Sequence, residues 1–426
     1  MMDRNRKAAF DILLSVEKGA YSNIASNKII TQSRPDDPRF VRELVHGVLS
    51  GEIFLDHVLD QLIPSGIKKV KAREKILLRL GLFQIIKAEK IPDYAAVGQT
   101  TEMAKKLCRG RDGFVNGVLR GYLKKRDQMV FPGREEDLRE FLRVNYSFPL
   151  WIIDLWTEQF GADVCEDMLK ASNCRPDLSI RINRLKTDRN SLTRELEKEG
   201  IEVRPGNLSP RALILLSGKG VFTTSAYKNG KFSVQDEASI FAADTIGVLP
   251  GENVIDMCAA PGGKAAAMAE MMENRGTLTA CDIFDHKLEL IKDQAQRLGI
   301  ENIKVRLADG RNGDPSMAES ADRVLVDAPC SGLGVIRRRP EIRYRSAEGI
   351  SDIIQIQKMI LQNASSYVKK GGTLMYSTCT VNDGENRRQI EAFTEKNSNF
   401  EIIYQKQFLP TQDVDGFYIC KMLKKG

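Results

Sequence analysis

Apolar residues recur at helical spacing through the first third of the chain. Stripes that repeat every three or four residues lie in 9–14, 40–49, 58–63 and 114–123, and each predicts a helix that buries one face. The segment 76–86 is apolar on nearly every side, which indicates a central helix packed among the others. This part of the chain is therefore predicted to form an all-helical domain.

The pattern changes beyond the helical region. Residues 178–185 alternate apolar and polar side chains as a half-buried strand does, 188–199 predict a helix, and 201–204 and 212–216 resemble short strands. We interpret this segment as a small α+β module. Three basic residues lie along its first strand and turn: Arg181, Arg184 and Lys186. The module is either an RNA-facing sheet or a spacer, and the sequence does not choose between them.

The last part of the chain alternates strands and helices. Short apolar runs predict strands at 254–256, 278–281, 303–307, 322–326 and 373–376. Helix-forming segments such as 264–272 and 287–298 separate them. This alternation predicts a parallel, doubly wound sheet in an α/β Rossmann-like domain. Ligands bind at the carboxyl edge of such sheets, so the residues that end the strands are candidates for a site.

The first of these strands passes directly into a loop of small residues. The loop reads Cys258, Ala259, Ala260, Pro261, Gly262, Gly263 and Lys264. Glycines let the backbone approach a ligand closely, and the N–H groups that begin the next helix point to the same place. The loop matches neither G-x-G-x-x-G nor G-x-x-x-x-G-K-[ST], so a dinucleotide or a triphosphate is not favoured. Taken alone, it is also compatible with an ordinary strand-to-helix turn.

Acidic residues end the next two strands. Asp282 lies at the tip of the second strand, where a carboxylate can bind both hydroxyls of a ribose, and Asp309 follows the third. Both should converge with the loop at one edge of the sheet. The loop could bind a charged tail, Asp282 a ribose and Asp309 an exocyclic amine. A ligand with these three groups contains adenosine. S-adenosylmethionine fits this set better than NAD.

Two cysteines follow the fourth and fifth strands, Cys330 within DAPCSG and Cys379 within YSTCT. A lone cysteine at a strand end is usually a small core residue. A pair at the ligand edge, with Asp327 between the strand and the first cysteine, indicates chemistry instead, because a thiolate adds to electron-poor carbon.

Composition narrows the remaining possibilities. The 426 residues are too many for one core, and a hydrophobic content of 42% with 28% charged residues is typical of globular proteins. No apolar run approaches the ~20 residues of a bilayer span, and the N-terminus lacks a secretion signal, so a cytoplasmic protein with no membrane contact is expected. The eight scattered cysteines and three histidines argue against a metal site. The net charge of +7 suits an anionic partner without establishing one.

Basic residues gather in the helical domain. They form three clusters: Lys68, Lys69, Lys71 and Arg73; Lys105, Lys106, Arg109 and Arg111; and Arg120, Lys124, Lys125 and Arg126. Each alone is typical of a solvated face, but together on one small domain they indicate a surface for a phosphate backbone. A further run follows the first cysteine motif: Arg337, Arg338, Arg339, Arg343, Tyr344 and Arg345. It either contacts phosphates or is solvated, and the two interpretations are equally favoured.

Two sets of motifs carry a resemblance to known families. The segments ILLRLGLFQII, IPDYAAVGQTTEMAKKL and GFVNGVLRGYL, within the first 125 residues, resemble the helical RNA-binding fold of the antitermination factor NusB. The segments DMCAAPGGK, DAPCSGLG and YSTCT, in this order, are similar to the RNA cytosine-C5 methyltransferases of the Sun/Fmu family. Together they span essentially the whole chain and point to the members of that family that modify 16S ribosomal RNA.

The resemblance implies a multidomain protein. An all-α NusB-like RNA-binding domain would span 1–145, a helical linker with the small α+β module 146–235, and an S-adenosylmethionine-dependent α/β Rossmann-like methyltransferase domain 236–426. It implies methylation of carbon 5 of cytosine 967 in 16S ribosomal RNA. We expect the protein to act as a monomer.

The resemblance also implies residue roles. The loop from Cys258 to Lys264 would line the S-adenosylmethionine site together with Asp282, Asp309 and Asp327. Cys379 would be the nucleophile and Cys330 would assist release. Ala265 stands where relatives commonly have threonine, which should matter little because the loop backbone does most of the binding.

Organic chemistry agrees with these roles. Carbon 5 of cytosine is too weakly nucleophilic to accept a methyl group until a thiolate has added at carbon 6. A carboxyl group at Asp327 would hold or supply a proton at N3, and Cys330 would help to expel the thiolate. The base must also be flipped into a pocket at the end of the sheet.

Two other classes of protein remain open. The first is a NusB-like RNA-binding adaptor with an inactive methyltransferase fold, against which the intact glycine loop and both cysteines argue. The second is a DNA cytosine methyltransferase in which Cys330 attacks, against which the NusB-like segment and Cys379 argue.

Overall fold

The computed structural model describes residues 3–88, 91–217 and 220–426, and the chain divides into two compact units. The helical unit comprises residues 1–174 and 336–345, and the sheet unit comprises 175–335 and 346–426. The chain therefore contributes to the helical unit twice, because a ten-residue segment leaves the sheet unit after Val335 and returns at Ser346.

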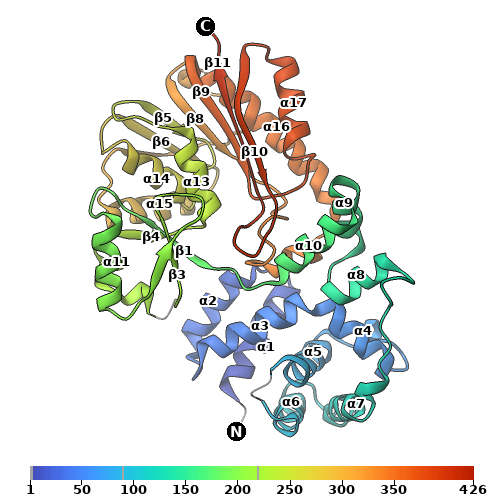
Figure 1. Cartoon of the computed structure of the whole chain (residues 1–426). Helices are drawn as coiled ribbons and strands as arrows, with labels where there is room; N and C mark the ends of the chain where they lie inside the picture. The colour runs from blue at the N-terminus through green and yellow to red at the C-terminus, as the bar shows by residue number, and fades with distance from the viewer. Residues whose placement is uncertain (1–2, 89–90, 218–219) are drawn as a thin grey trace. The chain divides into compact units, whose positions relative to one another are not determined.

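The helical unit has ten described α-helices, and the first seven of them share one apolar core (Figure 1). They are α1 (Arg4–Glu17), α2 (Ser22–Ser33), α3 (Pro38–Ser50), α4 (Glu52–Leu62), α5 (Ala72–Lys87), α6 (Asp93–Leu107), α7 (Asp112–Lys125), α8 (Leu138–Tyr146), α9 (Leu150–Phe160) and α10 (Ala162–Asn173). The predicted central helix is α5, which is buried on all sides. The predicted all-helical domain is thus confirmed.

The segment 336–345 packs into the helical unit through η5 (Pro340–Tyr344), a short 3-10 helix. The Arg343 guanidinium is fully buried, and its Nη1 donates to the carbonyls of Ser50 and Ser147 at 3.0 and 3.1 Å, at the carboxyl ends of α3 and α8. Its charge also lies over the Phe148 ring, 4.1 Å from the centroid. A cation is favoured at helix carboxyl ends, where carbonyls lack helical partners.

These contacts overturn both interpretations of the arginine run for two of its members. Arg343 and Arg337 are 0% and 2% exposed, so neither contacts a phosphate backbone nor lies in solvent. Burial lowers the pKa of Arg343 to about 10. Both interpretations assumed that the arginines are exposed, because a run of arginines in the sequence does not indicate which side chains are buried.

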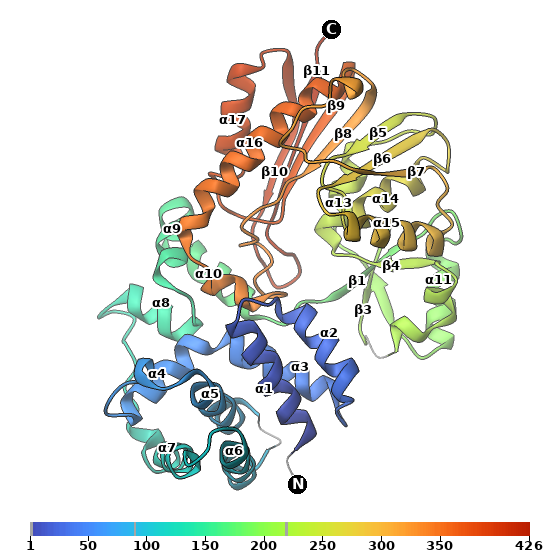
Figure 2. The same ribbon diagram turned by 180° about the vertical axis from the view of Figure 1, so that it is seen from behind.

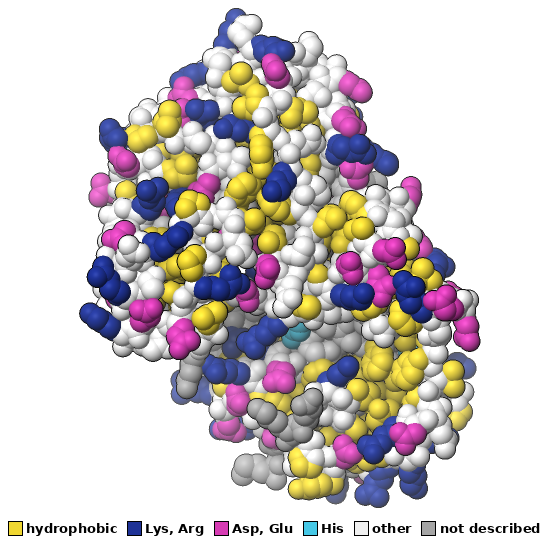
Figure 3. All heavy atoms as spheres, in the orientation of Figure 1, with side chains coloured by type: hydrophobic (Ala, Val, Ile, Leu, Met, Phe, Trp, Pro, Cys, Tyr) yellow, Lys and Arg dark blue, Asp and Glu magenta, His cyan; other side chains and the backbone are white. Residues whose placement is uncertain are grey.

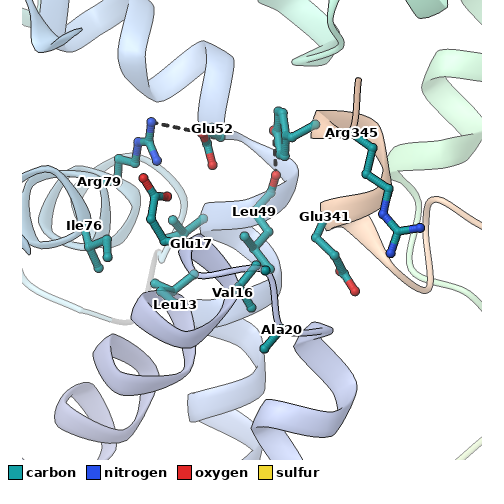
Figure 4. Close-up of a pocket in the computed structure, with 13 residues that line it drawn as sticks. Leu13, Val16, Glu17, Ala20, Leu49, Glu52, Ile76, Arg79, Glu341 and Arg345 are labelled. Carbon is teal, nitrogen blue, oxygen red and sulfur yellow. Dashed lines mark hydrogen bonds and ion pairs between the residues drawn. The ribbon is translucent and has the colours of Figure 1, made fainter. Parts of the chain in front are cut away.

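Beside η5 the helical unit contains a cavity of about 320 Å³. Figure 4 shows Glu17, Glu52 and Arg79 on one side of it and Glu341 and Arg345 on the other. Arg79 pairs with Glu52 at 3.0 Å. Burial raises the pKa of Glu52 although Arg79 opposes the shift.

The first part of the sheet unit is the small module. Its antiparallel sheet has the order β2-β3-β1-β4. The elements are β1 (Leu178–Ile182), α11 (Arg189–Lys198), β2 (Val203–Pro205), β3 (Ala212–Leu215), α12 (Ser225–Lys228) and β4 (Phe232–Val234). Asp188 caps α11 by accepting from the Ser191 N–H, and Leu192 and Leu196 face the core as predicted.

The main sheet has seven strands in the order β10-β11-β9-β8-β5-β6-β7 (Figure 2). They are β5 (Asn253–Asp256), β6 (Thr277–Asp282), β7 (Ile303–Leu307), β8 (Ala321–Asp327), β9 (Val368–Thr378), β10 (Phe400–Phe408) and β11 (Phe417–Lys424). The predicted strands β5 to β9 are parallel, but β10 and β11 pair antiparallel. The prediction of a wholly parallel sheet was therefore wrong at this edge, because β11 returns from β10 through a short loop without a crossover helix.

Helices cover both faces of this sheet. One face packs against α13 (Glu237–Ile246), α14 (Gly263–Met271) and α15 (Asp285–Leu298), and the other packs against α16 (Ile350–Tyr367) and α17 (Arg387–Lys396). Successive strand residues alternate between the two cores, as Val254 and Ile255 do. The doubly wound arrangement is confirmed. None of the described helices is long and apolar enough to cross a membrane.

Candidate active site

The loop after β5 is a tight turn that only glycine allows. Gly262 has a φ of +100°, and its N–H donates to the Ala259 carbonyl at 2.7 Å. A Cβ at this position would lie 3.3 Å from the Ile291 backbone on α15. Helix α14 begins at the next residue, so its first N–H groups have no helical acceptors and lie beside the turn.

Two of the predicted acids lie at neighbouring strand ends. The Asp282 carboxylate is nearly buried and accepts from the backbone N–H groups of Ala260, at 3.3 Å, and Phe284, at 3.0 Å. These bonds fix its orientation against the loop. Asp309, after β7, pairs with Arg311, and this hydrogen-bonded pair lowers the pKa of the carboxyl group.

Asp256, the last residue of β5, is a site residue that the sequence analysis did not select. It is fully buried, one carboxylate oxygen accepts from the Cys258 N–H at 3.4 Å, and the other has no hydrogen-bond partner among the described residues. Burial, helped by the negative charge of Asp327, raises its pKa to about 7. An acid that ends the first strand immediately before a glycine loop was the signal that could have identified it.

Asp327 ends β8 and is held by two side chains. Its Oδ2 accepts from Lys264 Nζ at 2.7 Å, and its Oδ1 accepts from the Ser377 hydroxyl at 2.8 Å. Lys264 is 11% exposed. Burial alone would lower the pKa of Lys264, but Asp327 and the negative charge available at Cys379 raise it. The first helical turn of α14 thus supplies an ammonium group to the cysteine site.

The two predicted cysteines meet in the structure. Their Sγ atoms lie 3.2 Å apart, and both residues are half-buried. Strands β8 and β9 are parallel neighbours with Asp327 opposite Ser377, so the loops that follow them share one edge of the sheet. The hydrogen bond with Cys379, followed by burial and the charge of Glu385, raises the pKa of the Cys330 thiol well above its usual range.

Three family models match consecutive parts of the chain. The NusB family model matches residues 3–124, an RsmF/B-like ferredoxin-like domain matches 148–221, and the 16S rRNA methyltransferase RsmB/F model matches 245–423. A probable ribosomal RNA small subunit methyltransferase B of Bacillus subtilis is 38% identical, and the match covers 99% of each chain. The chain belongs to the RsmB family of 16S ribosomal RNA methyltransferases.

Other relatives agree over most of the chain. The ribosomal RNA small subunit methyltransferase B of Escherichia coli O1:K1 is 31% identical over 91% of each chain. Among solved structures, PH0851 has a TM-score of 0.84 at 24% identity and covers 99% of each chain. NSun6 from Pyrococcus horikoshii, solved with SFG, has a TM-score of 0.59 at 22% identity and covers 66% of this chain and 99% of its own. These two structures share the fold.

As a member of the RsmB family the protein uses S-adenosylmethionine. The residues present fit this cofactor. Asp256 presents a buried carboxylate oxygen without a partner, suited to a cationic group, and Asp282 presents a carboxylate oriented beside the glycine turn. Among the described residues no cluster of histidine, cysteine or acidic side chains is suited to a metal ion.

The small module contributes to this RsmB-type site through Arg181. The guanidinium is fully buried, pairs with Glu270 at 2.7 Å and donates to the Gly263 carbonyl at 2.8 Å. Arg181 therefore does not face RNA. It fastens β1 of the module to α14 and to the glycine loop, whereas Arg184 on the following turn is exposed.

Asp282→Ala is expected to weaken S-adenosylmethionine binding by ~1–3 kcal/mol while RNA affinity is retained, because one oriented carboxylate is lost. Isothermal calorimetry of the purified protein measures the change. Asp285→Ala, an exposed acid three residues further on, is the matched control and should bind as the unmodified protein does. Equal cofactor affinities for the two variants would contradict the assignment.

Proposed function

We propose that the protein methylates carbon 5 of cytosine 967 in 16S ribosomal RNA through a covalent adduct with Cys379. The observation that carries the proposal is the pair of cysteine sulfurs 3.2 Å apart beside the Lys264–Asp327 ion pair. Two thiols and a proton-bearing pair are the groups that addition and release at a pyrimidine ring require.

Cys379 is suited to attack. The Lys264 ammonium stabilises negative charge at the Cys379 sulfur, which favours the thiolate that adds to carbon 6. The sulfur–carbon bond forms as the 5,6 double bond opens, and electron density moves into the ring. When bound, S-adenosylmethionine supplies an electrophilic methyl group for the activated carbon 5.

The Lys264–Asp327 pair is suited to control a proton at N3 of the base. Asp327 accepts hydrogen bonds from Ser377 and Lys264, so the orientation of its carboxylate is fixed before substrate binds. A pre-oriented group stabilises developing charge without reorganisation during the reaction. As electron density enters the ring, N3 takes a proton from solvent, and the Asp327 carboxylate accepts a hydrogen bond from this N3–H while the adduct exists; the proton returns to solvent on release.

Cys330 is suited to the release step. After carbon 5 loses its proton to a water molecule, the 5,6 double bond forms again and the bond to the Cys379 sulfur breaks. Because its pKa is raised, Cys330 remains a neutral thiol and can donate a hydrogen bond to the departing sulfur 3.2 Å away. The two thiols therefore act at opposite ends of one reaction.

The test is methyl transfer to defined nucleic acids. A 16S fragment that contains cytosine 967 should accept a labelled methyl group and yield labelled 5-methylcytidine on digestion. The same fragment with uridine at that position, and single-stranded DNA of the same sequence, should remain unlabelled. Label in another nucleoside, or undiminished label in the uridine fragment, would overturn the proposed target.

The helical unit is proposed to bind the RNA backbone. All twelve residues of the three basic clusters on this unit are exposed. In Figure 3, Lys and Arg side chains lie at the lower edge of this unit, where Figure 1 shows α6 and α7. The Lys105, Lys106 pair lies in the last turn of α6.

Changing both Lys105 and Lys106 to Glu is expected to weaken RNA binding and to make its dependence on salt shallower by ~2 in log–log slope, since about one phosphate contact is lost per lysine. Filter binding across a salt series measures both. The control replaces two exposed lysines of the sheet unit, Lys198 and Lys396, in the same way. Equal salt slopes for the two double variants would show that the two α6 lysines are solvated and do not contact phosphates.

A further inference from the structure

A buried carboxylate lies behind the loop that carries Cys330. Glu385 is fully buried, and its oxygens accept from the Ser331 N–H at 2.8 Å, the Asn382 amide at 3.1 Å and the Gln357 amide at 3.0 Å. The Ser331 hydroxyl also donates to it. The same Gln357 amide donates to the Pro329 carbonyl at 2.9 Å. The two neighbours of Cys330 are thus fixed by adjoining side chains: Ser331 by Glu385, and Pro329 by the Gln357 that also binds Glu385.

The next residue holds the loop that carries Cys379. Asn386 is also fully buried; its amide oxygen accepts from the Thr378 hydroxyl at 2.6 Å, and its amide nitrogen donates to the Thr380 carbonyl at 3.0 Å. Thr378 and Thr380 flank Cys379 in the chain. A second donation, to Gln407 on β10 at 2.7 Å, fixes the amide plane.

The two loops are joined to each other and to the sheet at the same place. The Ser331 hydroxyl and the Thr380 hydroxyl are 2.8 Å apart, and the Gly334 N–H donates to the Cys379 carbonyl at 3.1 Å. The Glu385 carbonyl accepts from the Tyr376 hydroxyl on β9 at 2.8 Å. The adjacent pair Glu385 and Asn386 is therefore anchored to the strand that leads to Cys379.

We propose that Glu385 and Asn386 are positioning residues that set the separation of the two cysteine sulfurs, with Glu385 holding Cys330 and Asn386 holding Cys379. The positioning roles are inferred from the hydrogen bonds alone. The expected effects on turnover and adduct formation rest on the proposed function. Each side chain acts through residues that flank a cysteine.

The charge of Glu385 gives the two loops different electrostatics. Cys330 faces the Cys379 sulfur and the Glu385 carboxylate, and both raise the pKa of its thiol together with burial. Cys379 lies instead within the influence of the Lys264 ammonium. A neutral residue in place of Glu385 should therefore lower the pKa of the Cys330 thiol.

The first experiment measures the thiols without catalysis. Full-length protein is alkylated with iodoacetamide across a pH series, and the tryptic peptides 324–337 and 371–387 report Cys330 and Cys379 separately. Glu385→Gln should move the Cys330 profile to lower pH. Asn386→Ala should change the rate at Cys379 several-fold, because its loop is released. Arg387→Ala, an exposed neighbour, is the matched control and should leave both profiles unchanged. This variant lacks the tryptic site at 387, so its second peptide is 371–388.

The second experiment measures turnover and RNA adducts on denaturing gels. A misplacement of about 1 Å costs roughly 100-fold in rate, so Asn386→Ala should lose about that factor in kcat, with little adduct and unchanged cofactor affinity. Glu385→Gln should instead accumulate adduct. If either substitution prevents folding, Thr378→Val and Ser331→Ala remove one partner of each and should give the same two patterns more weakly.

Two results separate the possible failures. Alkylation profiles and kcat within threefold of Arg387→Ala for both variants would overturn the positioning role, whatever the mechanism. If the alkylation profiles shift, the positioning role is supported. If the RNA adduct also maps to Cys330 in every variant, the proposed function is overturned.

Discussion

Cys379→Ala is expected to abolish methyl transfer and to leave no covalent complex with RNA, whereas Cys330→Ala is expected to accumulate one. Without the Cys379 sulfur, nothing adds at carbon 6 and carbon 5 is not activated. Without Cys330, attack and methylation still proceed beside the Lys264–Asp327 pair, but the departing sulfur loses the donor 3.2 Å away. Turnover should fall by several orders of magnitude in the first variant and stop after about one cycle in the second.

A denaturing gel of each variant with labelled RNA and S-adenosylmethionine makes the comparison. Cys420→Ala serves as control, because this buried cysteine lies on β11 away from both loops and should behave as the unmodified protein does. The opposite pattern, an adduct in Cys379→Ala and none in Cys330→Ala, would make Cys330 the nucleophile. If both variants lose stability and neither forms an adduct, Cys330 and Cys379 are packing residues only.

Glu270→Gln is expected to destabilise the sheet unit by ~3–5 kcal/mol, because it leaves the Arg181 guanidinium buried without its charge partner. Both side chains are 0% exposed. The same substitution frees Arg181 from its fixed position at the Gly263 carbonyl, so the affinity for S-adenosylmethionine should fall with the stability.

Calorimetry measures the transition of the sheet unit, which should move down by roughly 10 °C. The matched control is Glu289→Gln, which breaks an exposed pair with Lys292 on α15 and should cost less than ~1 kcal/mol. Equal melting temperatures for Glu270→Gln and Glu289→Gln would show that the buried pair does not secure the module to α14.

The sequence predicted the parts of the site that follow from strand ends. An apolar run followed by glycines indicates a strand, a turn and a helix, and in parallel sheets the strand ends share one edge. On this basis the sequence placed Asp282, Asp327, Cys330 and Cys379 at one edge of the sheet. In the structure Asp327 and the two cysteines follow the neighbouring strands β8 and β9, and Asp282 ends β6, which is separated from β8 by β5. Their roles toward cofactor and base remain proposals.

The sequence did not predict contacts between segments distant in the chain. Arg181 looked like one of several surface cations, because the Glu270 that buries it lies 89 residues further on. Arg343 belonged to a run of arginines, and it is buried because it donates to carbonyls at the carboxyl ends of α3 and α8, which lie far away in the sequence. Local pattern contains no information on such pairings.

Glu385 and Asn386 were missed for a related reason. They lie in NDGENRR, which looks like a polar turn that leads into a helix, and polar turns are ordinarily solvated. Both side chains are instead fully buried behind the cysteine loops. The strands β10 and β11 were missed because the sequence analysis looked for strands separated by helices, and β11 follows β10 through a short loop.

The most direct test of the proposed chemistry is to trap the adduct with RNA that contains 5-fluorocytosine at the target. A fluorine at carbon 5 is not released as a proton is, so attack and methylation proceed but elimination stops. After digestion with trypsin and ribonuclease, mass spectrometry should find the methylated nucleotide on peptide 371–387, which contains Cys379. Attachment to peptide 324–337, which contains Cys330, or the absence of any cofactor-dependent adduct, would contradict the account.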